Sequence, residues 1–222
     1  MIPLRDTQPS YSTPVVTIGI IVINVLVFLY QVSLNDYELN HFIQRFAIIP
    51  DRLQYGDILT AMFMHGGWMH LIGNMWFLWI YGDNVEDVLG HGKYLAFYLL
   101  CGFAAGLVHV YLAPYSRVPT LGASGAIAGV MGAYLIKFPH SKIITLVPLF
   151  IFLTTMEIPA VIMLIYWFVI QVFSGVGSIG YSNVSKGGVA WFAHIGGFLA
   201  GMFLIWVMGT RERFRMRRDL QW

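Results

Sequence analysis

Residues 122–134 read GASGAIAGVMGAY and residues 193–201 read AHIGGFLAG. In both stretches small residues recur at every fourth position: Gly125 and Gly129 in the first, and Ala193, Gly197 and Gly201 in the second. On a helix, residues four apart lie on one face. Small residues at this spacing let two membrane helices approach closely. We therefore expect two helices that pack against each other inside a membrane.

The composition of the 222-residue chain indicates a membrane protein. Hydrophobic residues make up 58% of the chain and charged residues only 11%, whereas soluble domains are roughly 25% charged. So few charged side chains could not cover a fold in water, and so apolar a chain is not disordered. Cys101 is the single cysteine, which excludes a disulfide scaffold. The net charge of +2 comes mostly from a tail beside an apolar segment, so we expect no nucleic-acid partner.

Six apolar segments are candidates to cross a bilayer, which takes about 20 residues of helix. The expected spans are 15–32, 58–81, 94–113, 124–138, 158–173 and 189–208. The fourth is short because it opens on a glycine-rich stretch, and such interruptions occur where backbone faces a cavity instead of lipid. The sequence therefore predicts an all-α, polytopic bundle of six transmembrane helices, without internal repeats.

The fifth apolar region leaves two interpretations open. Residues 143–173 are apolar but interrupted by Pro148, Glu157 and Pro159. Either 158–173 span alone while the preceding dozen residues lie at the membrane interface, or the region contains two spans. The positive-inside rule favours one span, because six spans place most Lys and Arg residues, including the C-terminal arginines, on the cytoplasmic side.

This topology divides the chain into three sections. Residues 1–14 are a short cytoplasmic N-terminus, 15–209 form the six-span domain, and 210–222 are a basic cytoplasmic tail. The first apolar segment lacks the basic start and the cleavage site of a signal peptide, so we expect it to be retained. The connection at about 33–57 mixes charged and apolar residues and should lie at the outer interface. The short N-terminus without a transit segment suits a prokaryotic cytoplasmic membrane.

Strongly polar side chains inside spans are functional candidates, because they are unfavourable in lipid unless they are partnered or line a cavity. The candidates are His65, His70, Asn74, His109, Ser124 and His194. His70 and Asn74 are four residues apart and can direct hydrogen-bond donors at one point. The same pair is also typical of hydrogen bonds that hold membrane helices together.

Ser124 and His194 have the chemistry of a nucleophile and its base. Ser124 lies between Gly122 and Gly125 at a helix start, where free N–H groups can stabilise an oxyanion. An imidazole such as that of His194 can act as a general base near neutral pH. Each could also have an ordinary structural role, as a helix cap for the serine and a buried donor for the histidine. No acidic ligand or HExxH pattern accompanies the histidines, so we expect no metal.

Three stretches together resemble the rhomboid family of intramembrane serine proteases. They are the two quoted above and residues 46–87, FAIIPDRLQYGDILTAMFMHGGWMHLIGNMWFLWIYGDNVED, in the family's order and at its usual separations. The resemblance implies a Ser–His dyad without an acidic third member, in which Ser124 is the nucleophile and His194 the base, and no cofactor. The residues expected around the oxyanion and substrate are His70, Asn74, Gly122 and Ala123. The implied partners are single-span membrane proteins, cut near a helix end at small residues, and the lipid bilayer.

The sequence departs from some members of that family at two points. The residue four after the serine is often an aromatic that stacks on the imidazole, but here it is Ala128. Trp191 or Phe198 could take over that role. A Trp-Arg pair found in the first outer loop of some members is also missing.

Two other functions remain compatible with the sequence. The first is an inactive rhomboid-like protein that binds membrane clients, although such proteins usually lack the serine or the histidine. The second is a small transporter or channel, which would be expected to carry inverted repeats and a polar pathway. The oligomeric state and the substrate's identity do not follow from the sequence.

Overall fold

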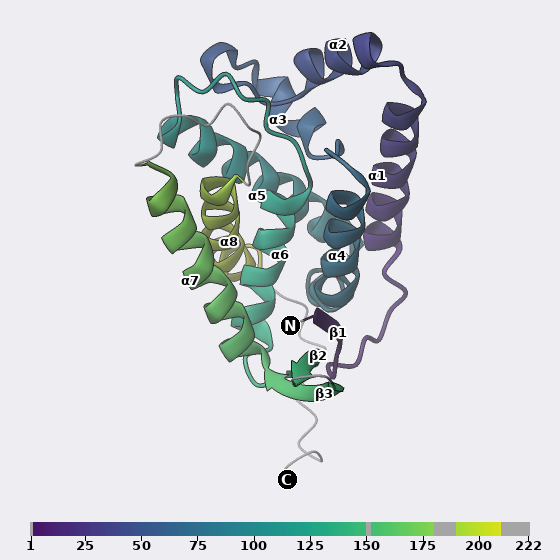
Figure 1. The fold of residues 1–222 in the computed structure, drawn as a ribbon. Helices are drawn as coiled ribbons and strands as arrows, with labels where there is room; N and C mark the ends of the chain where they lie inside the picture. Colours follow the sequence, from purple (N-terminus) through teal and green to yellow (C-terminus); the bar gives the residue numbers. More distant parts are fainter. Residues whose placement is uncertain (1, 150–151, 180–189, 210–222) are drawn as a thin grey trace.

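The chain forms a bundle of helices (Figure 1) in a computed structural model that describes residues 2–149, 152–179 and 190–209. Within these ranges the long helices are α1 (Val15–Ser33), α4 (Trp68–Leu89), α5 (His91–Leu112), α6 (Ser124–Lys137), α7 (Ala160–Ile179) and α8 (Trp191–Val207). Shorter helices are α2 (Asp36–Phe46), the 3-10 helix η1 (Pro50–Arg52) and α3 (Tyr55–Ala61). Apart from the second, each expected span coincides with one long helix. The tail expected at 210–222 lies outside the described residues.

The second expected span is broken into two helices. Residues 62–67 separate α3 from α4 and form a turn that contains His65 and ends in two glycines. Glycine has a low helix propensity, so this pair interrupts the helix. α4 then continues to Leu89, beyond the end expected at Tyr81.

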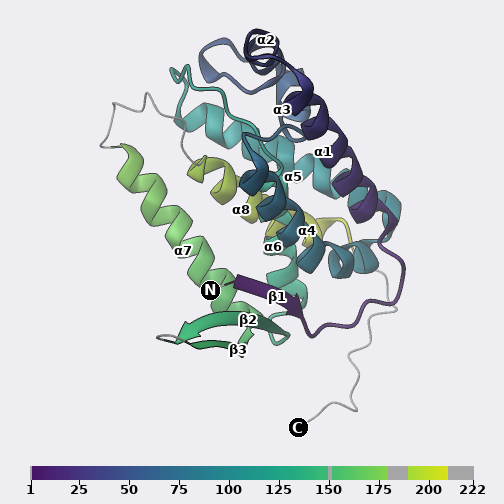
Figure 2. The ribbon, with the colours of Figure 1, turned by 45° about the vertical axis from the view of Figure 1, so that its right-hand side comes forward.

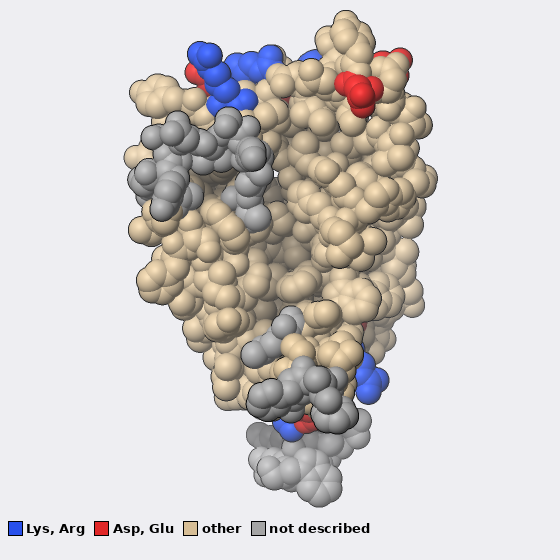
Figure 3. All heavy atoms as spheres, in the orientation of Figure 1, with Lys and Arg blue, Asp and Glu red and all other residues tan. Residues whose placement is uncertain are grey.

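The long helices run alternately between two ends of the bundle, with α2 and α3 at one end and a small β-sheet at the other (Figures 1 and 2). Within the described residues, α1, α5 and 160–177 of α7 are long and apolar enough to cross a membrane, and α6 and α8 are apolar but shorter. Large apolar side chains such as Phe173 (75% exposed) and Trp206 (78%) face outward. On the face shown in Figure 3, charged side chains gather at the two ends. An outward-facing apolar surface between two charged ends suits contact with lipid. The number of membrane spans stays a prediction.

The fold contains a sheet that the all-α prediction did not include. Strands β1 (Ile2–Asp6), β2 (Lys142–Leu149) and β3 (Phe152–Pro159) form an antiparallel sheet in that order. The hairpin of β2 and β3 lies at the start of α7 (Figure 2). The described residues of the region 143–173 therefore hold one helix, and the interpretation of this region as two spans is wrong.

The burial pattern accounts for the strands at residues 142–159. Ile143 and Thr145 are fully buried, while Ile144 and Leu146 between and after them are partly exposed. This alternation is typical of a strand with one covered face, and the β-branched residues in the segment favour a strand. The segment expected at the interface is thus a hairpin, paired with the N-terminal residues that the sequence placed in the cytoplasm.

α6 and α8 have their backbones in direct contact. A methyl group added at Gly197 would overlap the carbonyl oxygen of Gly125. One turn further along, a methyl group at Gly201 would overlap the carbonyl oxygen of Gly129. Only glycine allows this approach, as the four-residue spacing predicts. Gly125 faces Gly197, and Gly129 faces Gly201 four residues later on both helices. The two helices are therefore parallel and their N-terminal ends lie together.

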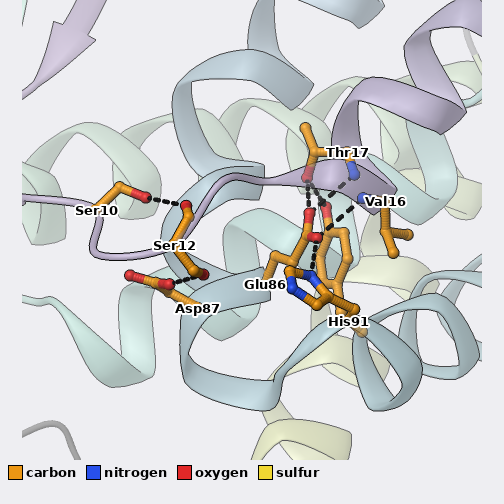
Figure 4. A network of polar contacts seen from close by, with 8 residues as sticks. Ser10, Ser12, Val16, Thr17, Glu86, Asp87 and His91 are labelled. Atoms are coloured by element: carbon orange, nitrogen blue, oxygen red, sulfur yellow. Dashed lines mark hydrogen bonds and ion pairs between the residues drawn. The ribbon is translucent and has the colours of Figure 1, made fainter.

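The C-terminal end of α4 holds the start of α1 through a buried carboxylate (Figure 4). Glu86 is fully buried and accepts hydrogen bonds from the N–H groups of Val16 (2.9 Å) and Thr17 (2.8 Å) and from the Thr17 hydroxyl (2.8 Å). Nδ1 of His91 lies 2.6 Å from the same carboxylate. A carboxylate at a helix N-terminus pairs with free N–H groups and complements the helix dipole. This contact fixes α1 antiparallel to α4.

The sheet is tied to α6 through Asp6. The Tyr134 hydroxyl donates to Asp6 at 2.6 Å. Burial raises the pKa of Asp6 from 3.8 to about 6, partly offset by that hydrogen bond. The charged carboxylate is therefore less favourable in the folded protein than in the unfolded chain.

We predict that Gly201→Ala destabilises the protein by about 1–3 kcal/mol, because the added methyl forces α8 away from α6. The measurement is the thermal unfolding midpoint of the purified chain in detergent. The control is Gly19→Ala in α1, where an added methyl meets no atom within 4 Å and helix propensity improves. Equal midpoints for the two variants would contradict the close contact.

The raised pKa of Asp6 predicts a pH-dependent effect of Asp6→Asn, which keeps an acceptor for Tyr134. Because the folded pKa lies above the unfolded one, the carboxyl group loses its stabilising contribution as the pH rises from about 4 through about 6. The unfolding midpoint of Asp6→Asn relative to the unsubstituted chain should rise across this window and stay constant above pH 7. If the two unfolding midpoints differ by the same amount at every pH, the effect of Asp6→Asn does not come from the burial of a charged Asp6.

Candidate functional site

Ser124 is the first residue of α6 and lies on the wall of a cavity between helices. The preceding residues are held in place by backbone hydrogen bonds, between Ile48 and Thr120 and from the N–H of Gly122 to the carbonyl of Ala61 (2.9 Å). The cavity has a volume of about 1030 Å³. Its lining includes the sequence candidates His70, Asn74, Gly122, Ser124 and His194.

Ser124 and His194 are in hydrogen-bond contact. Nε2 of His194 lies 2.8 Å from Oγ of Ser124. The two residues are 70 positions apart in the chain and meet because α6 and α8 run parallel with touching backbones. His194 is 8% exposed. The sequence could indicate these residues as candidates, but only the packing of the two helices brings them together.

The other nitrogen of His194 contacts a residue that the sequence did not single out. Nδ1 of His194 lies 2.8 Å from Oε1 of Gln171, on α7. The Gln171 amide nitrogen donates to the carbonyl of Trp167 at 3.1 Å, one turn earlier. Gln171 is 4% exposed. A polar side chain within an apolar span was the available signal, since the same rule had selected the histidines.

These hydrogen bonds define the protonation of the imidazole. The amide oxygen of Gln171 can only accept, so Nδ1 of His194 carries the hydrogen. Nε2 then presents its lone pair to the hydroxyl of Ser124, which donates. A serine hydroxyl in this position can transfer its proton to the ring when it attacks an electrophile.

The aromatic contacts of His194 come from α7 and from the start of α8. The Trp167 ring lies 5.7 Å from the imidazole at an interplanar angle of 33°, and the Trp191 ring lies 6.3 Å away edge-on at 87°. Phe198 instead stacks on Phe168 at 4.8 Å. The more nearly parallel ring beside His194 is therefore Trp167, which the sequence did not indicate, and not Trp191 or Phe198.

Two donors face the cavity from α4. The N–H of Gly66 donates to Nδ1 of His70 at 3.3 Å, so Nε2 of His70 carries the hydrogen. The Asn74 amide nitrogen lies 2.9 Å from Nε2 of His65. This hydrogen bond uses one of the two amide hydrogens of Asn74. A methyl group added at Gly122 would lie 2.8 Å from Nε2 of His70 and 3.6 Å from the Asn74 amide nitrogen. Both donor nitrogens therefore lie beside Gly122.

Gly122 and Ala123 shape the approach to Ser124 in different ways. Gly122 has a φ of +131°, which residues with a Cβ rarely adopt. Ala123 is fully buried in the hydrophobic core and precedes the first turn of α6. The backbone N–H groups of such a first turn lack acceptors within the helix.

The remaining histidine candidates have partners of their own. His65 accepts the Asn74 hydrogen bond, and Nε2 of His109 lies 2.9 Å from the Thr120 hydroxyl. The latter contact joins α5 to the segment that leads to Ser124. These two histidines thus hold neighbouring parts of the site in place.

Comparison with known proteins gives a family match and several relatives. The chain matches the Rhomboid domain over residues 52–211. It is 28% identical to the chloroplastic rhomboid-like protein 11 of Arabidopsis thaliana over 89% of its own length and 70% of that protein. It is 31% identical to the mitochondrial presenilin-associated rhomboid-like protein of Homo sapiens over 65% of its length and 38% of that protein. It is 31% identical to the rhomboid protease GluP of Bacillus subtilis over 70% of its length and 26% of that protein.

The matched part covers more than half of the chain and runs from the end of η1 to beyond α8. The chain spans less than half the length of the human and Bacillus relatives. The similarity to these two relatives therefore concerns only a part of each of them. On the extent of this match, the chain belongs to the rhomboid family.

Proposed function

We propose that the chain is an intramembrane serine endopeptidase that hydrolyses peptide bonds in or near transmembrane segments of membrane proteins. The observation that carries the proposal is the 2.8 Å contact between Oγ of Ser124 and Nε2 of His194, inside a cavity between apolar helices. One relative, GluP of Bacillus subtilis, is named a rhomboid protease.

The first half of the reaction forms an acyl-enzyme. Oγ of Ser124 attacks the scissile carbonyl carbon while its proton moves to Nε2 of His194. The peptide carbon–nitrogen bond then breaks, and the leaving amine takes that proton from the imidazolium. In the second half, water attacks the acyl carbon and gives a proton to Nε2, and Ser124 leaves with the proton restored.

The oxyanion of each tetrahedral intermediate needs hydrogen-bond donors in place before the reaction. The proposed donors are Nε2 of His70, the free amide hydrogen of Asn74 and the backbone N–H of Ser124. Support comes from the two side-chain donors that flank Gly122 and from the position of Ser124 at a helix start. A side chain at position 122 would occupy the space that this oxyanion requires.

The proposed substrates are single-span membrane proteins, cut near a helix end where an extended segment with small residues can enter the cavity. The proposed setting is a prokaryotic cytoplasmic membrane, crossed six times with both ends of the chain in the cytoplasm. The alternation of the long helices between the two ends of the bundle supports that topology.

We predict that Ser124→Ala and His194→Ala each lower cleavage of a model single-span substrate in liposomes by about 10³-fold or more, because either change removes the proton transfer. A serine-reactive fluorophosphonate should label the unsubstituted chain and fail to label Ser124→Ala. Matched controls are Ser33→Ala and His41→Ala, at exposed positions, which should retain full activity. If the folded, unsubstituted chain neither cleaves several such substrates nor reacts with the probe, the inactive client-binding function replaces this proposal.

Loss of one oxyanion donor should lower the rate of the chemical step. We predict that Asn74→Ala reduces kcat by about 10²–10³-fold with a much smaller change in KM. The measurement is steady-state cleavage in liposomes, and the control for fold is Asn40→Ala on the exposed side of α2. An unchanged kcat in a folded Asn74→Ala protein would remove Asn74 from the proposed mechanism.

A further inference from the structure

A buried amide stands where a serine hydrolase would need a group to orient its histidine. Oε1 of Gln171 lies 2.8 Å from Nδ1 of His194, on the side of the ring away from Ser124. Ser124, His194 and Gln171 thus form a continuous hydrogen-bonded chain that runs from α6 through α8 to α7. We infer that Gln171 is a positioning residue that selects the reactive tautomer and orientation of His194; this inference rests on the proposed function.

The orientation of the amide is fixed by its second hydrogen bond. The Gln171 nitrogen donates to the carbonyl of Trp167, so the oxygen is the atom turned toward His194. If the amide were reversed, two hydrogen-bond donors would face Nδ1, and the carbonyl of Trp167 would face an acceptor. Nδ1 would then have to accept, which moves the ring hydrogen to Nε2 and removes the lone pair that Ser124 requires. The local helix geometry of α7 therefore sets the tautomer of a residue on α8.

The same contact restricts rotation of the imidazole. Trp167 packs beside the ring at 5.7 Å, and Gln171 holds its far edge. Both residues come from one helical turn of α7, whose neighbouring residue Phe168 stacks on Phe198 of α8. The stack of Phe168 on Phe198 keeps α7 against α8. Because α7 is held there, the hydrogen bond to Gln171 fixes the orientation of the His194 ring.

An amide suits this buried site better than a carboxylate. An ionised group so far from water would add a large desolvation penalty. The amide oxygen supplies an acceptor for Nδ1 and a dipole that favours the imidazolium formed during catalysis, without carrying a net charge. The site can therefore orient its base without an acidic third member.

The test compares Gln171→Leu, which removes the acceptor, with Gln171→Glu, which preserves an oxygen acceptor at the same distance along the side chain. Cleavage of a model single-span substrate is measured in liposomes with the full chain. Gln171→Leu should lower kcat by about 10–100-fold, because Nδ1 is left buried without a partner, with KM changed by no more than about twofold. Gln171→Glu should keep kcat within about fivefold, because a neutral carboxyl group can accept from Nδ1 of His194 with its carbonyl oxygen and donate to the carbonyl of Trp167 with its hydroxyl. Phe173→Leu, at an outward-facing position of the same helix, is the control and should be unchanged.

A second readout does not depend on activity. Nitrogen-15 NMR of the histidine ring, assigned by comparison with His194→Ala, should report the Nδ1–H tautomer in the unsubstituted chain and its partial loss in Gln171→Leu. If Gln171→Leu does not fold, Gln171→Met, with an unbranched side chain of similar length, takes its place.

The inference and the proposed function fail in different ways. An Nε2–H tautomer in the unsubstituted chain, a normal kcat in Gln171→Leu, or equal losses in folded Leu and Glu variants would each overturn the role of Gln171. If the unsubstituted chain neither cleaves nor reacts with a fluorophosphonate while His194 shows the Nδ1–H tautomer that Gln171→Leu loses, the protease function fails and the orienting contact stands.

Discussion

The close contact between α6 and α8 is the constraint on which the rest of the site depends. In lipid there is little hydrophobic force to bring helices together, so association relies on packing and interhelical hydrogen bonds. Here glycines let the two backbones touch. The contact fixes the relative height of the helices, and with it the distance between Oγ of Ser124 and Nε2 of His194. A larger side chain at Gly197 or Gly201 would push α8 away from α6 and so alter the distance between Ser124 and His194, although neither glycine contacts these two side chains in the proposed reaction.

A second constraint is that buried polar groups need partners where water is excluded. At two places the structure meets this requirement with hydrogen-bonded chains that join elements distant in sequence. One chain runs from Ser124 through His194 to Gln171 and the backbone of α7. Another joins the start of α1 to Glu86 near the end of α4. The first ends at the Ser124 hydroxyl, on the wall of the cavity, whereas the second holds α1 and has no member among the residues that line the cavity.

The sequence predicted most of the long helices, because an uncharged run of about 20 apolar residues has the length of a bilayer-spanning helix. It also predicted contacts at Gly197 and Gly201 from their spacing. It did not predict the sheet, because an apolar run of eight residues fits a strand or a helix equally well. In addition, β1 lies more than 130 residues before the strand β2 with which it pairs. Gln171 is a polar side chain in an apolar span, which makes it a candidate by the same rule as the histidines. Its contact with His194 depends on how α7 packs against α8, and the sequence does not give that packing.

The start of three helices at one cavity links the fold to the proposed chemistry. His70 lies in the first turn of α4, Ser124 in that of α6 and His194 in that of α8, and all three line the cavity. The positive ends of three helix dipoles therefore face the same space, which favours an oxyanion there. The same field opposes the positive charge that His194 acquires when it accepts the proton of Ser124. A group that stabilises the imidazolium from the opposite side of the ring offsets this effect, and the amide oxygen of Gln171 occupies that position.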